Sequence, residues 1–213
     1  MFLNVRISSV TGAVSCSLAL MVFSWFINSG FPAHLISYGA LFLVAFLMSR
    51  QLSSWSDLKR VTGESSLSPK TFLFLIFGVL MGISMSVFYR WHLDRPLFMS
   101  ALLPFAITAA LIGSMEELVF RGYLQSQVSE KGSVFAILFS SLSHTGYKCF
   151  LFLTPALYSS VDIGFLAFWT FLFGLLAGII RHFAGNVWPV LIAHALFDIM
   201  VYGENIYPPW WVW

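Results

Sequence analysis

Long apolar stretches separated by short polar connections run through almost the whole chain. Most of them approach the roughly 20 residues that a helix needs to cross the hydrocarbon core of a bilayer. We therefore predict seven transmembrane helices, and an eighth if the apolar stretch 149–161, which Pro155 interrupts, also crosses. The predicted helices cover residues 10–27, 34–49, 71–89, 97–124, 133–150, 162–181 and 187–203.

The composition supports this interpretation. Hydrophobic residues make up 59% of the 213 residues and charged residues only 9%, whereas soluble domains carry about 25% charged residues. The expected fold class is an all-α, polytopic transmembrane helix bundle surrounded by the lipid bilayer. The short connections favour a prokaryotic cell membrane. A net charge of only +2, without a basic run, argues against a nucleic-acid partner.

Three charged residues interrupt the apolar pattern of the fourth predicted helix. They are Glu116, Glu117 and Arg121. Each costs about 2.5–3.5 kcal/mol to insert at membrane depth, so a role for them is expected. Helical residues four apart share a face, which pairs Glu117 with Arg121. Glu116 points elsewhere and stays available for general acid or base chemistry. The alternative is an ion-pair cluster that only locks helices together.

Two further predicted helices carry histidines in apolar surroundings. His194 and Asp198 are four residues apart on the last helix and share a face, and His144 stands alone on the fifth. At 1.5 Å per residue, Glu116, His144 and His194 lie about 12, 16 and 10 Å from the cytoplasmic ends of their helices. Their similar depth predicts one shared intramembrane polar site. Buried side chains without chemistry are the alternative at each position.

The polar residues occur in a recognisable order, Glu116-Glu117-x-x-x-Arg121, then His144, then His194-x-x-x-Asp198. This order resembles the EExxxR, FxxxH and HxxxN/D motifs of the CPBP intramembrane proteases. That family includes the CAAX prenyl endopeptidases and the Abi-type bacterial proteins, and the resemblance covers roughly residues 97–202. Ser140 stands where the family has the phenylalanine of its second motif, and Phe139 lies one position away.

The resemblance implies an intramembrane endopeptidase. Such an enzyme hydrolyses a peptide bond of a membrane-associated peptide or protein, which in this family can be lipid-modified. Glu116 would activate a water molecule, while Glu117 and Arg121 would hold the helix and tune Glu116. His194 and Asp198 would stabilise the tetrahedral oxyanion.

The resemblance leaves the metal dependence open. His144 would either position the water or bind a metal. Glu116, His144 and His194 could complete a zinc site with an open position, but they lack the HExxH spacing, and the same residues serve equally well as base and hydrogen-bond donors. We favour a glutamate-dependent reaction with no obligatory cofactor.

Two other classes of function are weighed against the protease. One is a non-catalytic membrane regulator or immunity-type protein on the same scaffold, against which the intact catalytic positions argue. The other is a small proton-coupled transporter, because intramembrane carboxylates and histidines relay protons. A transporter usually has inverted repeats or paired broken helices, and the sequence contains neither.

The chain divides into three parts on this interpretation. They are N-terminal transmembrane helices with a cytoplasmic loop over 1–96, a catalytic helix core over 97–203, and an aromatic interfacial tail over 204–213. The polar loop 50–70 is placed in the cytoplasm by its excess of Lys and Arg. Gly174 and Gly178 form a GxxxG pair, for which we expect a packing role inside the monomer.

Overall fold

The computed structural model describes residues 8–64, 68–154 and 161–205. Within these ranges the regular secondary structure is helical, which confirms the all-α fold class. A π-helical segment, η1 (Leu118–Leu124), joins two of the helices, and a short 3₁₀ turn, η2 (Ser129–Lys131), follows it. The α-helices are α1 (Ser9–Phe26), α2 (Leu35–Gln51), α3 (Trp55–Thr62), α4 (Pro69–His92), α5 (Phe105–Glu117), α6 (Gln125–Val128), α7 (Ser133–Leu153), α8 (Ile163–Ala184) and α9 (Trp188–Tyr202).

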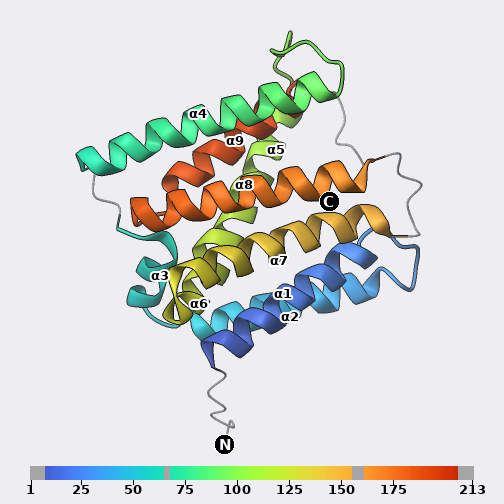
Figure 1. Ribbon diagram of the computed structural model, residues 1–213. Coiled ribbons are helices and arrows are strands. Elements are labelled where there is room, and N and C mark those ends of the chain that lie inside the picture. The colour runs from blue at the N-terminus through green and yellow to red at the C-terminus, as the bar shows by residue number, and fades with distance from the viewer. Residues whose placement is uncertain (1–7, 65–67, 155–160, 206–213) are drawn as a thin grey trace, which may run out of the picture.

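The helices form two layers (Figure 1). Helices α4, α8, α7 and α1 lie side by side, and α2 packs against α1. Helix α9 packs along both α4 and α5, so that α5 and α9 lie behind the first layer. This arrangement brings α5, α7 and α9, which carry the predicted site residues, around one interior space.

Most predicted helices begin within two residues of their predicted starts, but the fourth does not. It was expected over 97–124 and begins instead at Phe105. The preceding residues are apolar enough to resemble a span, but Pro96 and Pro104 frame them, and proline cannot donate a backbone hydrogen bond to a helix. Their backbone groups form hydrogen bonds outside a helix. For example, the N–H of Leu103 donates to the Gly203 carbonyl at 2.7 Å.

Among the described residues, three helices are long and apolar enough to cross a membrane. They are α1, α4 and α8, and α2 with α3 makes a fourth candidate that is bent by 115°. Helix α9 is apolar but shorter. Residues 155–160 and 206–213 lie outside the described residues, so the eighth span and the aromatic tail stay predictions, as does the total of seven spans.

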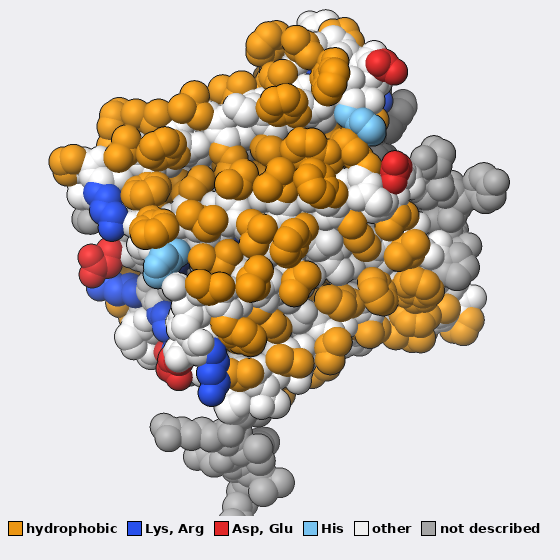
Figure 2. Space-filling view, viewed as in Figure 1, with side chains coloured by type: hydrophobic (Ala, Val, Ile, Leu, Met, Phe, Trp, Pro, Cys, Tyr) orange, Lys and Arg blue, Asp and Glu red, His pale blue; other side chains and the backbone are white. Residues whose placement is uncertain are grey.

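The surface has the distribution of side chains that a bilayer requires. Figure 2 shows apolar side chains covering the face of the molecule, while charged side chains gather toward its two ends. Phe72 of α4 and Phe168 of α8 are 66% and 61% exposed. Soluble monomers rarely expose contiguous apolar patches of more than a few hundred Å². This apolar belt therefore identifies a membrane protein whose outer helix faces meet lipid.

Helix α3 lies within the loop predicted over 50–70, where no helix was expected. It begins with a capping box, in which the Asp57 N–H donates to the Ser54 hydroxyl and the Ser54 N–H donates to the Asp57 carboxylate. Val61 on this helix is buried against the bundle. The motif Ser54-x-x-Asp57 is a signal for a helix start that the hydropathy pattern alone does not reveal.

Two glycines of α4 set its distance from α9. A Cβ at Gly78 would overlap the Pro189 carbonyl, and a Cβ at Gly82 would overlap the Ala193 carbonyl. Such small-xxx-small pairs let helix backbones approach closely in a membrane. The position of α9, and of the side chains that it carries, therefore depends on these glycines.

The predicted role of the Gly174–Gly178 pair is confirmed. A Cβ at Gly174 would crowd the Arg121 guanidinium and Ser141, and one at Gly178 would crowd Ile137. Both glycines thus face other helices of the same chain, and they bring α8 against α7 and η1.

Gly82→Val is expected to lower the stability of the protein in detergent. The added side chain meets a backbone carbonyl that cannot move aside, and overpacking of this kind typically costs about 1–3 kcal/mol. Gly39→Val is the matched control, because nothing lies within 4 Å of a Cβ at Gly39. The measurement is the Tm of the two variants. An equal Tm for both would contradict the close α4–α9 contact.

A buried arginine ties the ends of α4 and α9 together. The side chain of Arg90 is fully buried and donates to the Pro96 carbonyl at 2.5 Å and the Met200 carbonyl at 2.7 Å. It also pairs with the Glu204 carboxylate at 3.1 Å. The same carboxylate accepts hydrogen bonds from the backbone N–H and hydroxyl of Ser100 at 2.6 and 2.8 Å.

This cluster makes the stability of the protein depend on pH. The N–H and hydroxyl of Ser100, together with Arg90, lower the pKa of Glu204 from 4.5 to about 2. A carboxylate with a lowered pKa stabilises the fold fully above its ordinary pKa and loses this contribution as the pH falls toward 2. Wild-type Tm is therefore expected to fall between pH 4.5 and pH 2. Glu204→Gln should lower the Tm at pH 7 and reduce that acid-dependent fall, and an unchanged fall would contradict the assignment.

Candidate active site

The EExxxR segment lies at a change of helix type. Helix α5 ends at Glu117, and the π-helical segment η1 carries Arg121. The sequence predicts a regular helix here, and the residue pattern contains no signal for the π segment. Single π-helical turns are rare and often occur at functional sites. The predicted pairing survives the change, because Arg121 Nη1 lies 3.0 Å from Glu117 Oε1.

Glu117 and Arg121 are both fully buried. The guanidinium lies 6.0 Å from the ring centroids of both Phe120 and Phe173, which provides cation–π contacts in place of water. The pair does not line the cavity described below. It lies behind the cavity wall and supports the residues that form it.

The hydrogen-bond partners of His144 determine which of its ring nitrogens carries the hydrogen. Arg121 Nη1 is 2.7 Å from His144 Nδ1. An arginine side chain only donates, so Nδ1 accepts and the hydrogen of the neutral ring is on Nε2. That nitrogen donates to Glu116 Oε2 at 3.1 Å. The histidine on α7 is therefore oriented by Arg121 and in turn orients Glu116.

Glu116 is engaged on both of its oxygens, contrary to the expectation that it stays available. Besides its bond from His144, it accepts a hydrogen bond on Oε1 from Lys148 Nζ at 2.6 Å. Lys148 lies one helical turn beyond His144 in the same apolar stretch, and the sequence reasoning missed it. The rule that draws attention to Glu116, that an ionisable residue at membrane depth has a role, would have found Lys148 as well.

His194 lies among three carboxylates. Its Nδ1 atom donates to Glu117 Oε1 at 2.8 Å, which leaves Nε2 facing the interior space. Nε2 is 3.8 Å from both Glu116 Oε2 and Asp198 Oδ2, a separation that leaves room for a bridging water. Gly113 of α5 permits this approach, since a Cβ there would overlap the Asp198 carboxylate and the His194 ring.

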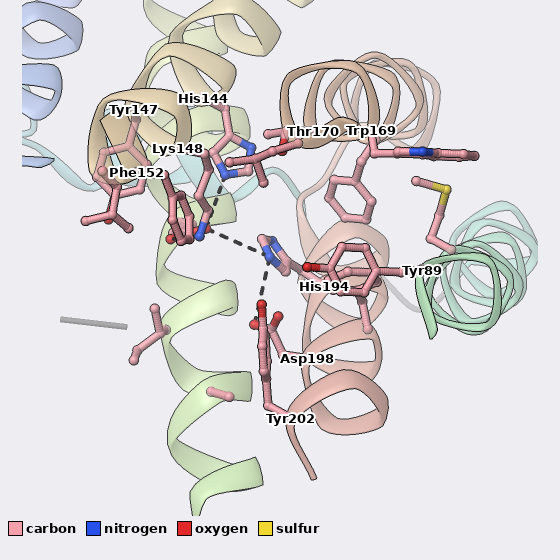
Figure 3. Close-up of a pocket in the computed structure, with 18 of the residues that line it drawn as sticks. Tyr89, His144, Tyr147, Lys148, Phe152, Trp169, Thr170, His194, Asp198 and Tyr202 are labelled. Carbon is pink, nitrogen blue, oxygen red and sulfur yellow. Dashed lines mark hydrogen bonds and ion pairs between the residues drawn. The ribbon is translucent and has the colours of Figure 1, made fainter. Parts of the chain in front are cut away.

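These residues meet at a cavity of about 150 Å³ between α4, α5, α7, α8 and α9. In Figure 3, His144 and Lys148 approach from α7, and His194, Asp198 and Tyr202 approach from α9. The charged and polar groups that line it include Glu116, His144, Lys148, His194 and Asp198. Aromatic side chains, among them Tyr89, Trp169, Phe173 and Phe197, form much of the rest of the lining. The predicted common site of Glu116, His144 and His194 is thus present as a geometric unit.

Comparison with known protein families gives one match. Residues 98–200 match the family described as type II CAAX prenyl endopeptidase, Rce1-like. This part of the chain is similar to the Rce1-like family. No curated protein and no solved structure matches the chain. The Rce1-like segment contains all six residues predicted for the site, and it begins and ends close to the limits of the resemblance that the motifs indicated.

The Rce1-like segment departs from the FxxxH pattern at the position four residues before its second-motif histidine. Ser140, which replaces the phenylalanine, is buried, and its hydroxyl donates to the Ile137 carbonyl at 3.2 Å. Phe120 of η1 stacks on the His144 ring instead, with 4.5 Å between ring centroids. The aromatic contact to this histidine therefore comes from the segment that carries the EExxxR motif.

The residues at this Rce1-like site are not arranged as the zinc site considered from the sequence would require. To bind a metal through Nε2, His144 would have to move its hydrogen to Nδ1, where Arg121 already donates. The Lys148 ammonium also occupies one oxygen of Glu116. Among the described residues, no three His, Cys, Asp or Glu side chains are placed to hold a metal ion.

Proposed function

We propose that the protein is an intramembrane endopeptidase in which Glu116 activates the water that attacks a substrate peptide bond. The observation that carries the proposal is the placement of Glu116 Oε2, which lies 3.1 Å from His144 Nε2 and 3.8 Å from His194 Nε2 at the wall of the cavity. A carboxylate within reach of a bound water and oriented by fixed donors has the geometry of a general base.

The reaction can be written with these residues. Glu116 Oε2 takes a proton from the water, the water oxygen bonds to the carbonyl carbon, and the carbonyl electron pair becomes the oxyanion. With both ring nitrogens protonated, His194 donates from Nε2 to this oxyanion, since Glu117 already accepts from Nδ1. The C–N bond then breaks, and the leaving nitrogen takes the proton from Glu116. Asp198 lies beside His194 Nε2 and stabilises its protonated form.

The family and the cavity support a substrate class. We assign a membrane-associated peptide or protein with a lipid-modified segment. The support is the Rce1-like family description and the aromatic and apolar side chains that line the cavity. The short loops favour a prokaryotic cell membrane as its location.

The experiment uses the purified protein in liposomes with a panel of membrane-anchored peptides, some of them prenylated near the C-terminus. Mass spectrometry of the products locates the cleaved bond. A new C-terminus within the anchored peptide is the expected result. The proposal fails if every panel member, including the prenylated ones, remains intact at enzyme concentrations equal to those of the peptide.

The reaction is also expected to proceed without a resident metal ion. This is supported by the Arg121 hydrogen bond to His144 and by the Lys148 ammonium on Glu116, which provide positive charge where a metal ion would otherwise be needed. EDTA or phenanthroline should leave kcat unchanged. A loss of cleavage that added zinc restores would contradict this expectation.

A further inference from the structure

We propose that Lys148 is a positioning residue for the reaction, which fixes the orientation and the charge of Glu116. The inference rests on the proposed function, because it assumes that Glu116 is the base. Lys148 lies outside the EExxxR, FxxxH and HxxxN/D motifs, and the structure alone brings it to the site.

The contact between Lys148 and Glu116 is direct. Lys148 Nζ lies 2.6 Å from Glu116 Oε1, and the lysine side chain is 25% exposed, whereas that of Glu116 is 8% exposed. The ammonium also lies 5.7 Å from the centroid of the Tyr147 ring. Lys148 therefore reaches Glu116 from the cavity side, where a substrate also enters.

The charges around the cavity explain why a lysine is needed. Arg121 pairs with Glu117, and His194 lies between Glu117 and Asp198. Without Lys148, the Glu116 carboxylate would keep neutral His144 as its hydrogen-bonded partner, and the nearest cation would be protonated His194, which Glu117 and Asp198 also share. The charged and titratable groups of the described residues that meet here are Glu116 and Glu117 from α5, Arg121 from η1, His144, Tyr147 and Lys148 from α7, His194, Asp198 and Tyr202 from α9, and Tyr89 from α4.

Each carboxylate oxygen of Glu116 accepts a hydrogen bond from a different donor. Lys148 binds Oε1 and His144 binds Oε2, so the plane of the carboxylate is fixed and the remaining lone pair of Oε2 is left for the water. When Glu116 takes the proton, the lysine keeps its charge close to the developing oxyanion. The contribution of Lys148 should therefore appear in kcat much more than in KM.

The test compares variants on a peptide that the wild-type protein cleaves. Lys148→Met is expected to lower kcat about 10²-fold, the loss typical for one preorganised donor, with little change in KM. Lys148→Arg should restore most of the rate. Lys148→Ala should gain activity on addition of ethylammonium, which fits the space vacated by the side chain, while Lys148→Met should not. Lys131→Met, at an exposed lysine remote from the cavity, is the matched control.

Each outcome separates a positioning role from a structural one. Wild-type or higher activity in Lys148→Met overturns the inference, and so does a loss that neither arginine nor ethylammonium reverses. The Tm of each variant in detergent shows whether it is folded. Glu116→Gln is measured in parallel. If that variant still cleaves, the proposed function fails; if it is inactive while Lys148→Met is fully active, only the role of Lys148 fails.

Discussion

Glu116→Gln is expected to lower kcat by about 10²–10⁴-fold, the contribution typical of a general base. Glutamine has nearly the same shape as glutamate, so the cavity should keep its form, and its one carbonyl oxygen can still accept a hydrogen bond from Lys148, whereas its NH2 group cannot accept the bond that His144 donates to the second oxygen. What the variant loses is the ability to take a proton from water. The measurement is the initial rate of peptide cleavage in liposomes, with Tm recorded to show that the variant is folded.

The control for this variant is Glu130→Gln, which changes an exposed carboxylate at the end of the bundle near η2. It should cleave at the wild-type rate. Retention of activity by Glu116→Gln would remove this residue from the role of base. The other groups at the cavity would then have to be reconsidered one by one, beginning with Asp198, whose carboxylate also lines the cavity.

Arg121→Met is expected to destabilise the protein by about 3–5 kcal/mol, because removal of one partner of a buried ion pair leaves the other uncompensated. Glu117 and Arg121 are both 0% exposed, so the remaining carboxylate could not reach water without unfolding of its surroundings. Activity should be lost as well, since Arg121 also holds the Nδ1 atom of His144. Thermal unfolding in detergent measures the first effect, and the cleavage assay measures the second.

A double variant separates the effect of the charges of Glu117 and Arg121 from the effect of their packing. Glu117→Gln combined with Arg121→Met removes both charges, and it should recover much of the stability that Arg121→Met loses. It should not recover cleavage, because the Nδ1 atom of His144 would lose the Arg121 donor and the Nδ1 atom of His194 would lose the Glu117 carboxylate. A double variant less stable than Arg121→Met would show that the pair matters through packing rather than through its charges.

The apolar stretches predict the helices well because a bilayer demands long apolar segments with internally satisfied backbones. Helices α1 and α9 each begin one residue from their predicted starts, and α9 has Pro189 in its first turn. The exception, the late start of α5, arises where Pro104 interrupts a segment that hydropathy cannot distinguish from a span. Helix α3 was missed because its signal is a cap and not a run of apolar residues.

The site was predictable to the extent that rare charges mark it. Glu117 and Arg121 pair as their spacing requires, and the depth argument correctly predicted that His144 and His194 meet Glu116. The contacts of Glu116 were not predictable, because the direction of a side chain depends on the π segment and on the angles between helices. Lys148 and the stacking of Phe120 on His144 depend on the same tertiary geometry.

Two of the helices around the cavity, α4 and α8, contribute none of the groups that form its ion pairs, which has a consequence for engineering. The ionisable groups at the cavity are carried by α5, α7 and α9, whereas α4 and α8 contribute side chains such as Tyr89, Trp169 and Thr170 (Figure 3). Replacements at these three positions leave every charged contact in place. Replacement of these three side chains is therefore expected to alter which peptides the proposed protease accepts without removing an ion pair at the cavity.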